Sequence, residues 1–299
     1  MARPVPYACI DIGSNTTRLL VAEPVDGRMR EVLAQRAFTR LGRGLKPGHA
    51  IAEAKLAEVA DVVATQVRLA HELRAQELRA VATAAIRVAS NGSRLVEVVG
   101  AQSGVAVTIL TEEEEARLAF MGATKTLGHA LEGDVAVADV GGSSSELAIG
   151  TVDRGVRWFE SFPVGSGFLA DAYLHSDPPS VAELHATRQH VEGVFEGLQT
   201  DRPQLAVAVG GSATSLRRLV GARLEHEALE RGIRTLASLP VAEVARRFEV
   251  EPERARLLPA GIMILEAISD HLGTPLQIGN GGLREGVILE LINRDRELR

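Results

Sequence analysis

Two turns that lie a domain's length apart in the sequence carry the residue types that bind phosphate groups. The segments 11–20 and 139–148 share the pattern D-[IV]-G-x-x-[ST]-[ST]-x-L. Backbone N–H groups and hydroxyls that crowd into a tight turn bind phosphate oxygens without net positive charge. An ordinary hairpin turn would explain one copy, but a turn that only reverses the chain rarely repeats its aspartate, its hydroxyls and its length together. The pair predicts two phosphate-binding loops, and Asp11 and Asp139 could hold Mg²⁺ through water or merely cap the turns.

A third anion or nucleotide site is predicted at residues 210–214. The letters G-G-S-A-T follow an apolar run and precede a helical pattern, so backbone donors and a helix N-terminus meet there. Alone this signal is weak, and it gains weight beside the paired turns.

Four successive glutamates begin a predicted helix after residue 111, and local rules assign structural roles to three of them. Thr111 and Glu114 have the spacing of a capping box. Glu112 suits the positive end of the helix dipole, and Glu113 is spaced to pair with Arg117. Glu115 is left without a structural role, so it could act as a general base on water or be an ordinary helix residue.

Arg87 is predicted to lie in a loop after a strand, just before a helix that starts near Asn91. An arginine there can contact a terminal phosphate with two donors, and Asn91 can add a hydrogen bond. An exposed arginine and a helix N-cap explain the same residues equally well. The eight histidines show no metal-ligand spacing, and no nucleophile elbow or P-loop lysine is present.

The elements that would position these residues repeat in the two halves of the chain. Apolar runs at 7–12 and 135–140 precede the paired turns, and further runs follow them at 18–22 and 146–149. Third strands are predicted at 30–39 and 156–164. Strands at 78–82, 105–110 and 205–209 each precede a helical pattern. Long helices are predicted at 51–73 and 179–198, a helical stretch broken by prolines at 236–272, a strand at 276–278 and a last helix at 284–294. The pattern is that of an α/β protein with two similar domains.

Composition limits the class of protein further. The chain has 299 residues, of which 45% are hydrophobic and 24% charged, which is typical of a globular protein of two domains. The net charge of -6 argues against nucleic acid or an anionic membrane as a partner. Cys9 is the only cysteine, so no internal disulfide or zinc cluster can form. The absence of a signal-peptide pattern or a long apolar run predicts a cytoplasmic protein. The oligomeric state stays open, a homodimer included.

The chain resembles the exopolyphosphatase and guanosine pentaphosphate phosphohydrolase (Ppx/GppA) family. The resemblance rests on motifs that occur in the family's order from residue 7 to residue 291: D-I-G-S-N-T, T-A-A-I-R-V-A-S-N, E-E-A-R, D-V-G-G-S-S-S-E, P-V-G-S-G, V-G-G-S-A-T and L-R-E-G-V-I-L. It implies two actin-like (ribonuclease H-like) domains of the actin, sugar-kinase and chaperone-ATPase superfold around an interdomain cleft. Domain I is then expected at 1–123 plus 284–299, because the family's C-terminal helix returns to it, and domain II at 124–283.

The same resemblance implies an Mg²⁺-dependent phosphohydrolase that removes the terminal phosphate of inorganic polyphosphate or the 5'-phosphate of guanosine pentaphosphate. Glu115 matches the family's base, and Arg87 is expected to contact the phosphates and to neutralise charge that develops on the transferred oxygens. The expected metal ligands are Asp139 and Glu146. The expected phosphate contacts are Ser14, Asn15, Asn91, Gly142, Ser144 and Gly211. A kinase or ATPase of the same superfold, a non-catalytic sensor of these polyanions and a filament-forming actin relative remain as alternatives.

Two departures from the family's pattern bear on activity. Ser143 stands where the family usually has a third glycine, and a serine would be strained there if the position needs positive φ. Longer members carry a helical C-terminal extension beyond the point that corresponds to Arg299, from which a preference for short polyphosphate is expected.

Overall fold

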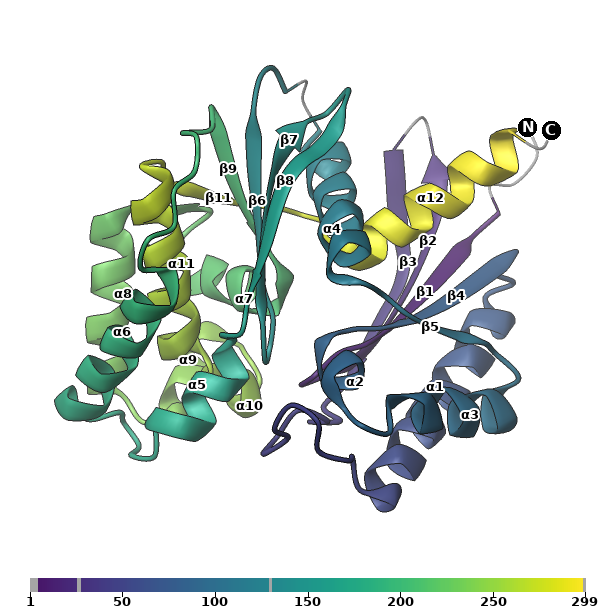
Figure 1. Cartoon of the computed structure of the whole chain (residues 1–299), viewed down its shortest axis with the longest axis horizontal. Helices are drawn as coiled ribbons and strands as arrows, with labels where there is room; N and C mark the ends of the chain where they lie inside the picture. The colour runs from purple at the N-terminus through teal and green to yellow at the C-terminus, as the bar shows by residue number, and fades with distance from the viewer. Residues whose placement is uncertain (1–4, 26–27, 129–130, 298–299) are drawn as a thin grey trace. The chain divides into compact units, whose positions relative to one another are not determined.

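The chain forms two compact units, which are described separately (Figure 1). The computed structural model describes residues 5–25, 28–128 and 131–297. Unit 1 is Met1–Thr126 with Gly281–Arg299, and unit 2 is Leu127–Asn280. From the sequence, domain I is expected at 1–123 plus 284–299 and domain II at 124–283. Each boundary between the observed units lies three residues from the expected one.

Unit 1 is a five-stranded sheet with helices on both faces. Its elements are β1 (Tyr7–Ile12), β2 (Thr17–Val25), β3 (Arg28–Ala37), α1 (Glu53–Glu72), β4 (Glu77–Ala82), α2 (Ala84–Val88), α3 (Gly92–Ser103), β5 (Val107–Ile109), α4 (Glu112–Thr126) and α12 (Leu283–Glu297). The strand order is β3-β2-β1-β4-β5. The first three strands pair antiparallel, while β4 pairs parallel with β1 and with β5.

Both faces of the unit 1 sheet are buried, because alternate residues of β1 point to opposite sides. Ala8, Ile10 and Ile12 pack in the cluster that α1 and α3 cover. Tyr7 and Cys9 pack in the cluster to which α4 and α12 contribute. The helix α12 therefore completes unit 1 although all of unit 2 precedes it in the sequence.

Unit 2 repeats this plan with more helices. Its elements are β6 (Val135–Val140), β7 (Ser145–Thr151), β8 (Gly155–Phe162), α5 (Ser166–Tyr173), α6 (Val181–Phe195), β9 (Leu205–Val209), α7 (Gly210–Val220), β10 (Arg223–Leu224), α8 (His226–Ser238), α9 (Val241–Phe248), α10 (Pro252–Ala255), α11 (Leu258–Leu272) and β11 (Leu276–Ile278). The strand order is β10-β11-β9-β6-β7-β8.

The internal repeat predicted from the sequence is confirmed at the level of topology. Read from its other edge, the unit 2 sheet runs β8-β7-β6-β9-β11, which matches β3-β2-β1-β4-β5 strand for strand, with β10 added at the edge. In both units an antiparallel meander continues into parallel strands. The fold class is α/β, as expected.

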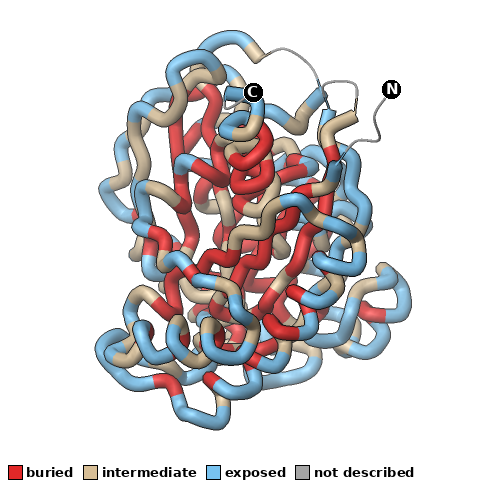
Figure 2. Tube along the Cα trace, turned by 90° about the vertical axis from the view of Figure 1, so that its right-hand side faces the viewer, coloured by how far each residue is buried: buried red, intermediate tan, exposed pale blue. Residues whose placement is uncertain are grey.

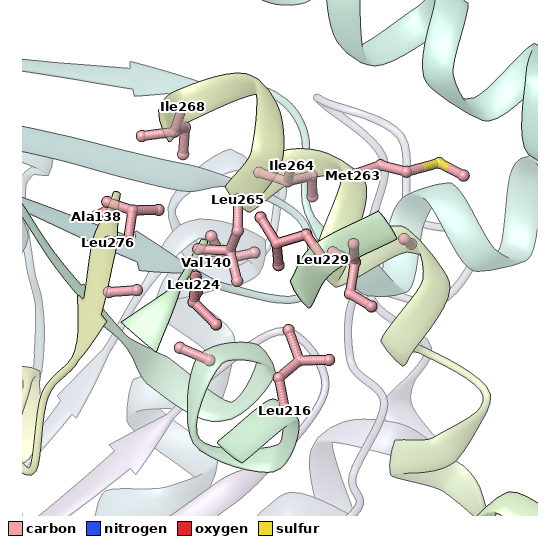
Figure 3. Packing of buried hydrophobic residues seen from close by; sticks show 14 of the residues in the cluster. Ala138, Val140, Leu216, Leu224, Leu229, Met263, Ile264, Leu265, Ile268 and Leu276 are labelled. Atoms are coloured by element: carbon pink, nitrogen blue, oxygen red, sulfur yellow. The ribbon is translucent and has the colours of Figure 1, made fainter. Parts of the chain in front are cut away.

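The core of unit 2 is built around α11. Figure 3 shows Ala138 and Val140 of β6 facing the apolar side chains of α11, with Leu216 of α7 and Leu229 of α8 nearby. Figure 2 shows that buried residues follow the strands, with exposed residues on the surrounding helices and loops.

Several boundaries differ from the sequence prediction. The breaks predicted in the stretch 236–272 are confirmed: Pro240 precedes α9, and Pro252 and Pro259 lie in the first turns of α10 and α11, where a proline loses no intrahelical hydrogen bond. The strand predicted at 105–110 is reduced to β5 (Val107–Ile109). The short elements α2, α5 and β10 were not predicted. No helix within the described ranges is long and apolar enough to cross a membrane.

Candidate active site

The first predicted phosphate loop is a tight turn between β1 and β2. The Gly13 N–H donates to the Thr16 carbonyl at 3.0 Å. The segment after β3 packs against the tip, where Gly42 donates its N–H to the Ser14 carbonyl at 2.7 Å and Arg40 donates to the Asn15 carbonyl at 2.9 Å. These bonds fix the backbone on which Ser14 and Asn15 are presented.

The second predicted loop, between β6 and β7, has the same closing hydrogen bond. The Gly141 N–H donates to the Ser144 carbonyl at 3.0 Å, and the Gly142 carbonyl accepts from the Phe168 N–H at 2.8 Å. Among the described residues other than glycine, positive φ occurs at Arg40, Arg74 and Glu249, so Ser143 is not in the left-handed region. The condition under which Ser143 would strain this loop is therefore not met.

The residue pairs that flank the two turns differ in charge. Asp11 is directly opposite Arg18 in the β1–β2 ladder, and a 2.8 Å ion pair joins them. At the equivalent register of the β6–β7 ladder, Asp139 is opposite Glu146. Directly opposed residues of antiparallel strands point to the same face with β-carbons about 5 Å apart. Unit 2 therefore brings two carboxylates together where unit 1 pairs a carboxylate with a guanidinium, and Asp11 is the weaker metal candidate.

The carboxylate pair of unit 2 adjoins the first turn of α7. Glu146 is buried and accepts a hydrogen bond from the Ser161 hydroxyl at 3.2 Å. A β-carbon at Gly210 would collide with an Asp139 oxygen, so glycine there lets the carboxylate approach the helix. Across the part of the chain that the structure describes, no group of three or more His, Cys, Asp or Glu side chains is placed to hold a metal ion. A site here would have two protein carboxylates, which suits Mg²⁺ because that ion keeps several waters.

Arg87 and Glu115 are in direct contact in unit 1. Arg87 lies in the short helix α2 rather than in the predicted loop, and its Nη1 donates to Glu115 Oε2 and to the Leu110 carbonyl, both at 2.9 Å. The Glu115 residue is 8% exposed, and the Arg87 side chain is 19% exposed. The Arg87 Nε is buried with no hydrogen-bond partner in the described structure. The guanidinium thus orients the Glu115 carboxylate.

Of the structural roles predicted for the glutamates at the start of α4, one is confirmed and one is wrong. Thr111 and Glu114 form the predicted capping box, with the Glu114 N–H donating to the Thr111 hydroxyl and the Glu114 carboxylate accepting from the Thr111 N–H. The predicted partner of Arg117 is wrong, because its guanidinium donates to Glu290 of α12 at 2.7 Å. Glu290 also accepts from Arg79. Burial raises its pKa, but the hydrogen bonds from the two arginines prevail and the pKa of Glu290 is lowered.

Asn91 stands at the predicted N-cap position of α3, and its side chain makes contacts that were not predicted. Its side-chain oxygen accepts from the Ile51 N–H at 2.8 Å, and its Nδ2 donates to the Ile51 carbonyl at 2.9 Å. Asn91 precedes α3, but its side chain makes no capping hydrogen bond. The amide therefore fastens the segment before α1 to the start of α3, and at most one amide N–H remains for a phosphate.

A model of the Ppx/GppA phosphatase family matches residues 20–295. The chain belongs to this family.

Relatives and solved structures agree with the assignment of this Ppx/GppA protein. Exopolyphosphatase 1 of Mycobacterium leprae is 27% identical over 96% of this chain and 90% of its own. The guanosine-5'-triphosphate,3'-diphosphate pyrophosphatase of Vibrio parahaemolyticus is 26% identical over 97% of this chain but 60% of its own. The crystal structure of the Aquifex aeolicus Ppx/GppA family member superposes with a TM-score of 0.81 at 29% identity, and covers 97% of this chain and 98% of that one. Each unit therefore has the actin-like fold.

Three arginines near the predicted loops of this Ppx/GppA protein were missed by sequence reasoning. Arg18 pairs with Asp11. Burial and the charge of Arg18 lower the pKa of Arg284, at the start of α12, while Glu285 and Asp11 oppose the shift. Arg254 is 5% exposed on α10 and lies against Gly211 in the first turn of α7. Arg18 occupies the position of the repeat at which unit 2 has Glu146, so a comparison of the two copies could have identified Arg18. No local sequence pattern marks Arg254 or Arg284.

Proposed function

We propose that this protein is an exopolyphosphatase, which hydrolyses the terminal phosphoanhydride bond of inorganic polyphosphate. Membership of a phosphatase family supports hydrolysis of phosphate bonds. The Mycobacterium leprae relative supports polyphosphate as the substrate, because its match extends over 90% of that protein. The match to the Vibrio parahaemolyticus relative leaves 40% of that protein uncovered, so guanosine pentaphosphate is the second candidate.

The observation that carries the proposal is the contact between Arg87 and Glu115. In the proposed step a water oxygen attacks the terminal phosphorus, the bond from phosphorus to the bridging oxygen breaks, and the water proton passes to Glu115. A carboxylate base repels a polyanion unless positive charge lies beside it. Arg87, 2.9 Å from Glu115, supplies that charge.

The metal in this proposal is Mg²⁺, held by Asp139 and Glu146. The donor set fits, because both groups offer carboxylate oxygens from one face of the sheet and Gly210 leaves space beside Asp139. When bound, Mg²⁺ neutralises negative charge on the phosphoryl oxygens. The backbone donors of the two turns and of the first turn of α7 orient the phosphate chain.

The deciding experiment compares orthophosphate release from short polyphosphate, long polyphosphate, guanosine pentaphosphate and ATP with Mg²⁺. For Glu115→Gln we expect kcat on polyphosphate to fall by roughly 10² to 10⁴, because the variant cannot accept the water proton. Glu113→Gln is the matched control, since Glu113 is exposed on the same helical turn, and it should keep wild-type kcat.

Each outcome assigns a function. Release from polyphosphate that collapses only in Glu115→Gln supports an exopolyphosphatase. Faster release from guanosine pentaphosphate favours the second candidate. A folded wild type that binds polyphosphate but releases nothing from the four substrates overturns the proposal in favour of a sensor.

A further inference from the structure

Buried hydroxyls connect two loops of unit 2 that the proposed reaction uses for phosphate binding. The Ser212 hydroxyl, in the first turn of α7, donates to the Ser166 hydroxyl at 3.0 Å. The Ser166 hydroxyl in turn donates to the Gly141 carbonyl at 3.2 Å. Ser166 and Ser212 are both buried, and the bond between their hydroxyls is buried as well. A shift of either loop would break the chain of hydrogen bonds.

The backbone around Ser166 also supports the loop between β6 and β7. The Ser166 N–H donates to the Gly141 carbonyl at 3.0 Å, two residues before the bond from Phe168 to Gly142. A β-carbon at Gly165 would lie 2.5 Å from the Gly142 carbonyl carbon and the Ser143 nitrogen. The segment 165–168 is thus packed directly on the loop, with glycine at the closest approach.

Arg254 holds the same turn of α7 from another side. A β-carbon at Gly211 would lie 2.6 Å from Arg254 Nη2 and 2.8 Å from its Cζ. The guanidinium occupies the space that a side chain at position 211 would need, so glycine is required there even without a bound phosphate.

We propose that Ser166 and Arg254 are positioning residues for the phosphate chain. Ser166 sets the Gly141–Ser144 loop relative to the Gly210–Ser212 turn, and Arg254 fixes the turn at Gly211. Neither residue takes part in the attack of water. The inference rests on the proposed function, since it takes both loops as phosphate-binding groups.

The first test is Ser166→Ala, measured with tripolyphosphate and Mg²⁺. We expect KM to rise about tenfold with kcat within about twofold, because the loss of both hydrogen bonds of the Ser166 hydroxyl loosens the loops without touching the base. The control is Thr187→Val, which removes a buried hydroxyl bonded within α6, away from both loops. It should lower the unfolding midpoint and leave KM unchanged. An unchanged KM in Ser166→Ala overturns the role of Ser166. If Ser166→Ala does not fold, Ser212→Ala removes the bond between the two hydroxyls and keeps the one from Ser166 to Gly141, so KM should rise by a smaller factor, and an unchanged KM overturns the role of this contact.

The second test is a double-mutant cycle between Gly211 and Arg254. In the wild type, Gly211→Ala should raise KM about tenfold or more, because the new methyl group displaces the guanidinium. In the Arg254→Ala background the same change should raise KM less than about threefold, since the colliding group is gone. Equal effects in the two backgrounds overturn the role of Arg254.

Calorimetric binding of tripolyphosphate separates this inference from the proposed function. If the wild type hydrolyses none of the substrates but binds tripolyphosphate, and Ser166→Ala binds it about tenfold more weakly, the positioning role stands and the proposed function fails. If the wild type hydrolyses polyphosphate and the variants keep its KM and Kd, only the positioning role fails. A wild type that neither hydrolyses nor binds tripolyphosphate overturns both.

Discussion

One residue difference between the two copies of the repeat bears on the metal site proposed for unit 2. Arg18 and Glu146 stand at equivalent positions of equivalent hairpins, each opposite an aspartate. The guanidinium neutralises Asp11, whereas a second carboxylate beside Asp139 adds negative charge that a cation can compensate. Equivalent hairpins thus carry an ion pair in unit 1 and a candidate cation site in unit 2.

This contrast predicts the effect of Glu146→Gln on the metal requirement. The Mg²⁺ concentration for half-maximal phosphate release should rise about tenfold or more, since one of the two carboxylates is lost. Glu160→Gln, on the exposed side of the neighbouring strand β8, is the control. A Mg²⁺ titration that is the same in Glu146→Gln and in the wild type would remove Glu146 from the metal site.

Local sequence rules identified residues whose roles depend on near neighbours and failed where the partner is distant. The spacing of Thr111 and Glu114 predicted a capping box, which gave Glu114 a structural role and helped to single out Glu115 as the glutamate without one. Nothing in the local pattern could pair Arg117 with Glu290, or Asn91 with Ile51, since only the tertiary fold brings them together. Spacing within a helix predicts which side chains of that helix are neighbours, but it does not predict contacts with other elements of the fold.

At the scale of elements, length and periodicity decide what can be predicted. The hairpin strands and the long helices α1 and α6 have enough apolar repeats to be recognised. The helix α2 has five residues and α5 has eight, too few for a reliable period. The misplacement of Arg87 in a loop follows from this, because α2 is the element that carries it.

The capping box of α6 predicts a pH dependence of stability. N–H groups of Ser180, His175 and Ser176 donate to the Glu183 carboxylate and lower its pKa to about 2, against partial desolvation. The folded-state pKa is below the ordinary value of 4.5, so this stabilisation is fully present above that pH and is lost as the pH falls toward about 2. Glu183→Gln should therefore lose less stability than the wild type over this range.

Urea unfolding at a series of pH values checks the prediction for α6. The exposed Glu192→Gln on the same helix is the control and should follow the wild-type curve. Parallel pH profiles for Glu183→Gln and the wild type would show that this carboxylate does not contribute.

At the scale of the whole molecule, unit 1 depends on a close contact between α4 and α12. A β-carbon at Gly286 would collide with the Leu118 carbonyl, and one at Gly122 with the Gly282 carbonyl. Glycines on both helices let their backbones approach, and this contact holds the helix that carries Glu115. The sequence motif L-R-E-G contains Gly286, but its packing role follows only from the fold.

Gly286→Ala should destabilise unit 1 by about 1–3 kcal/mol, because the methyl group forces the helices apart. Trp158, the only tryptophan, lies in β8 of unit 2. We expect circular dichroism to show an earlier unfolding transition in the variant, while the urea midpoint of Trp158 fluorescence stays within about 0.3 M of the wild type if unit 2 unfolds independently. Gly193→Ala, at a helix position with open space in unit 2, is the control. A tryptophan midpoint that falls together with the dichroism midpoint would show that the two units unfold as one.

The position of α12 in the sequence has a consequence for synthesis on the ribosome. Unit 2 is one continuous stretch, so it can close its core as soon as residue 280 has emerged. Unit 1 begins the chain, but one face of its sheet stays uncovered until Val287, Ile288 and Leu291 are made. Nascent chains normally fold from the N-terminal domain onward. In this chain we expect the reverse order, because the core of unit 2 can close while the cluster that α4 and α12 form on the unit 1 sheet still lacks its α12 residues.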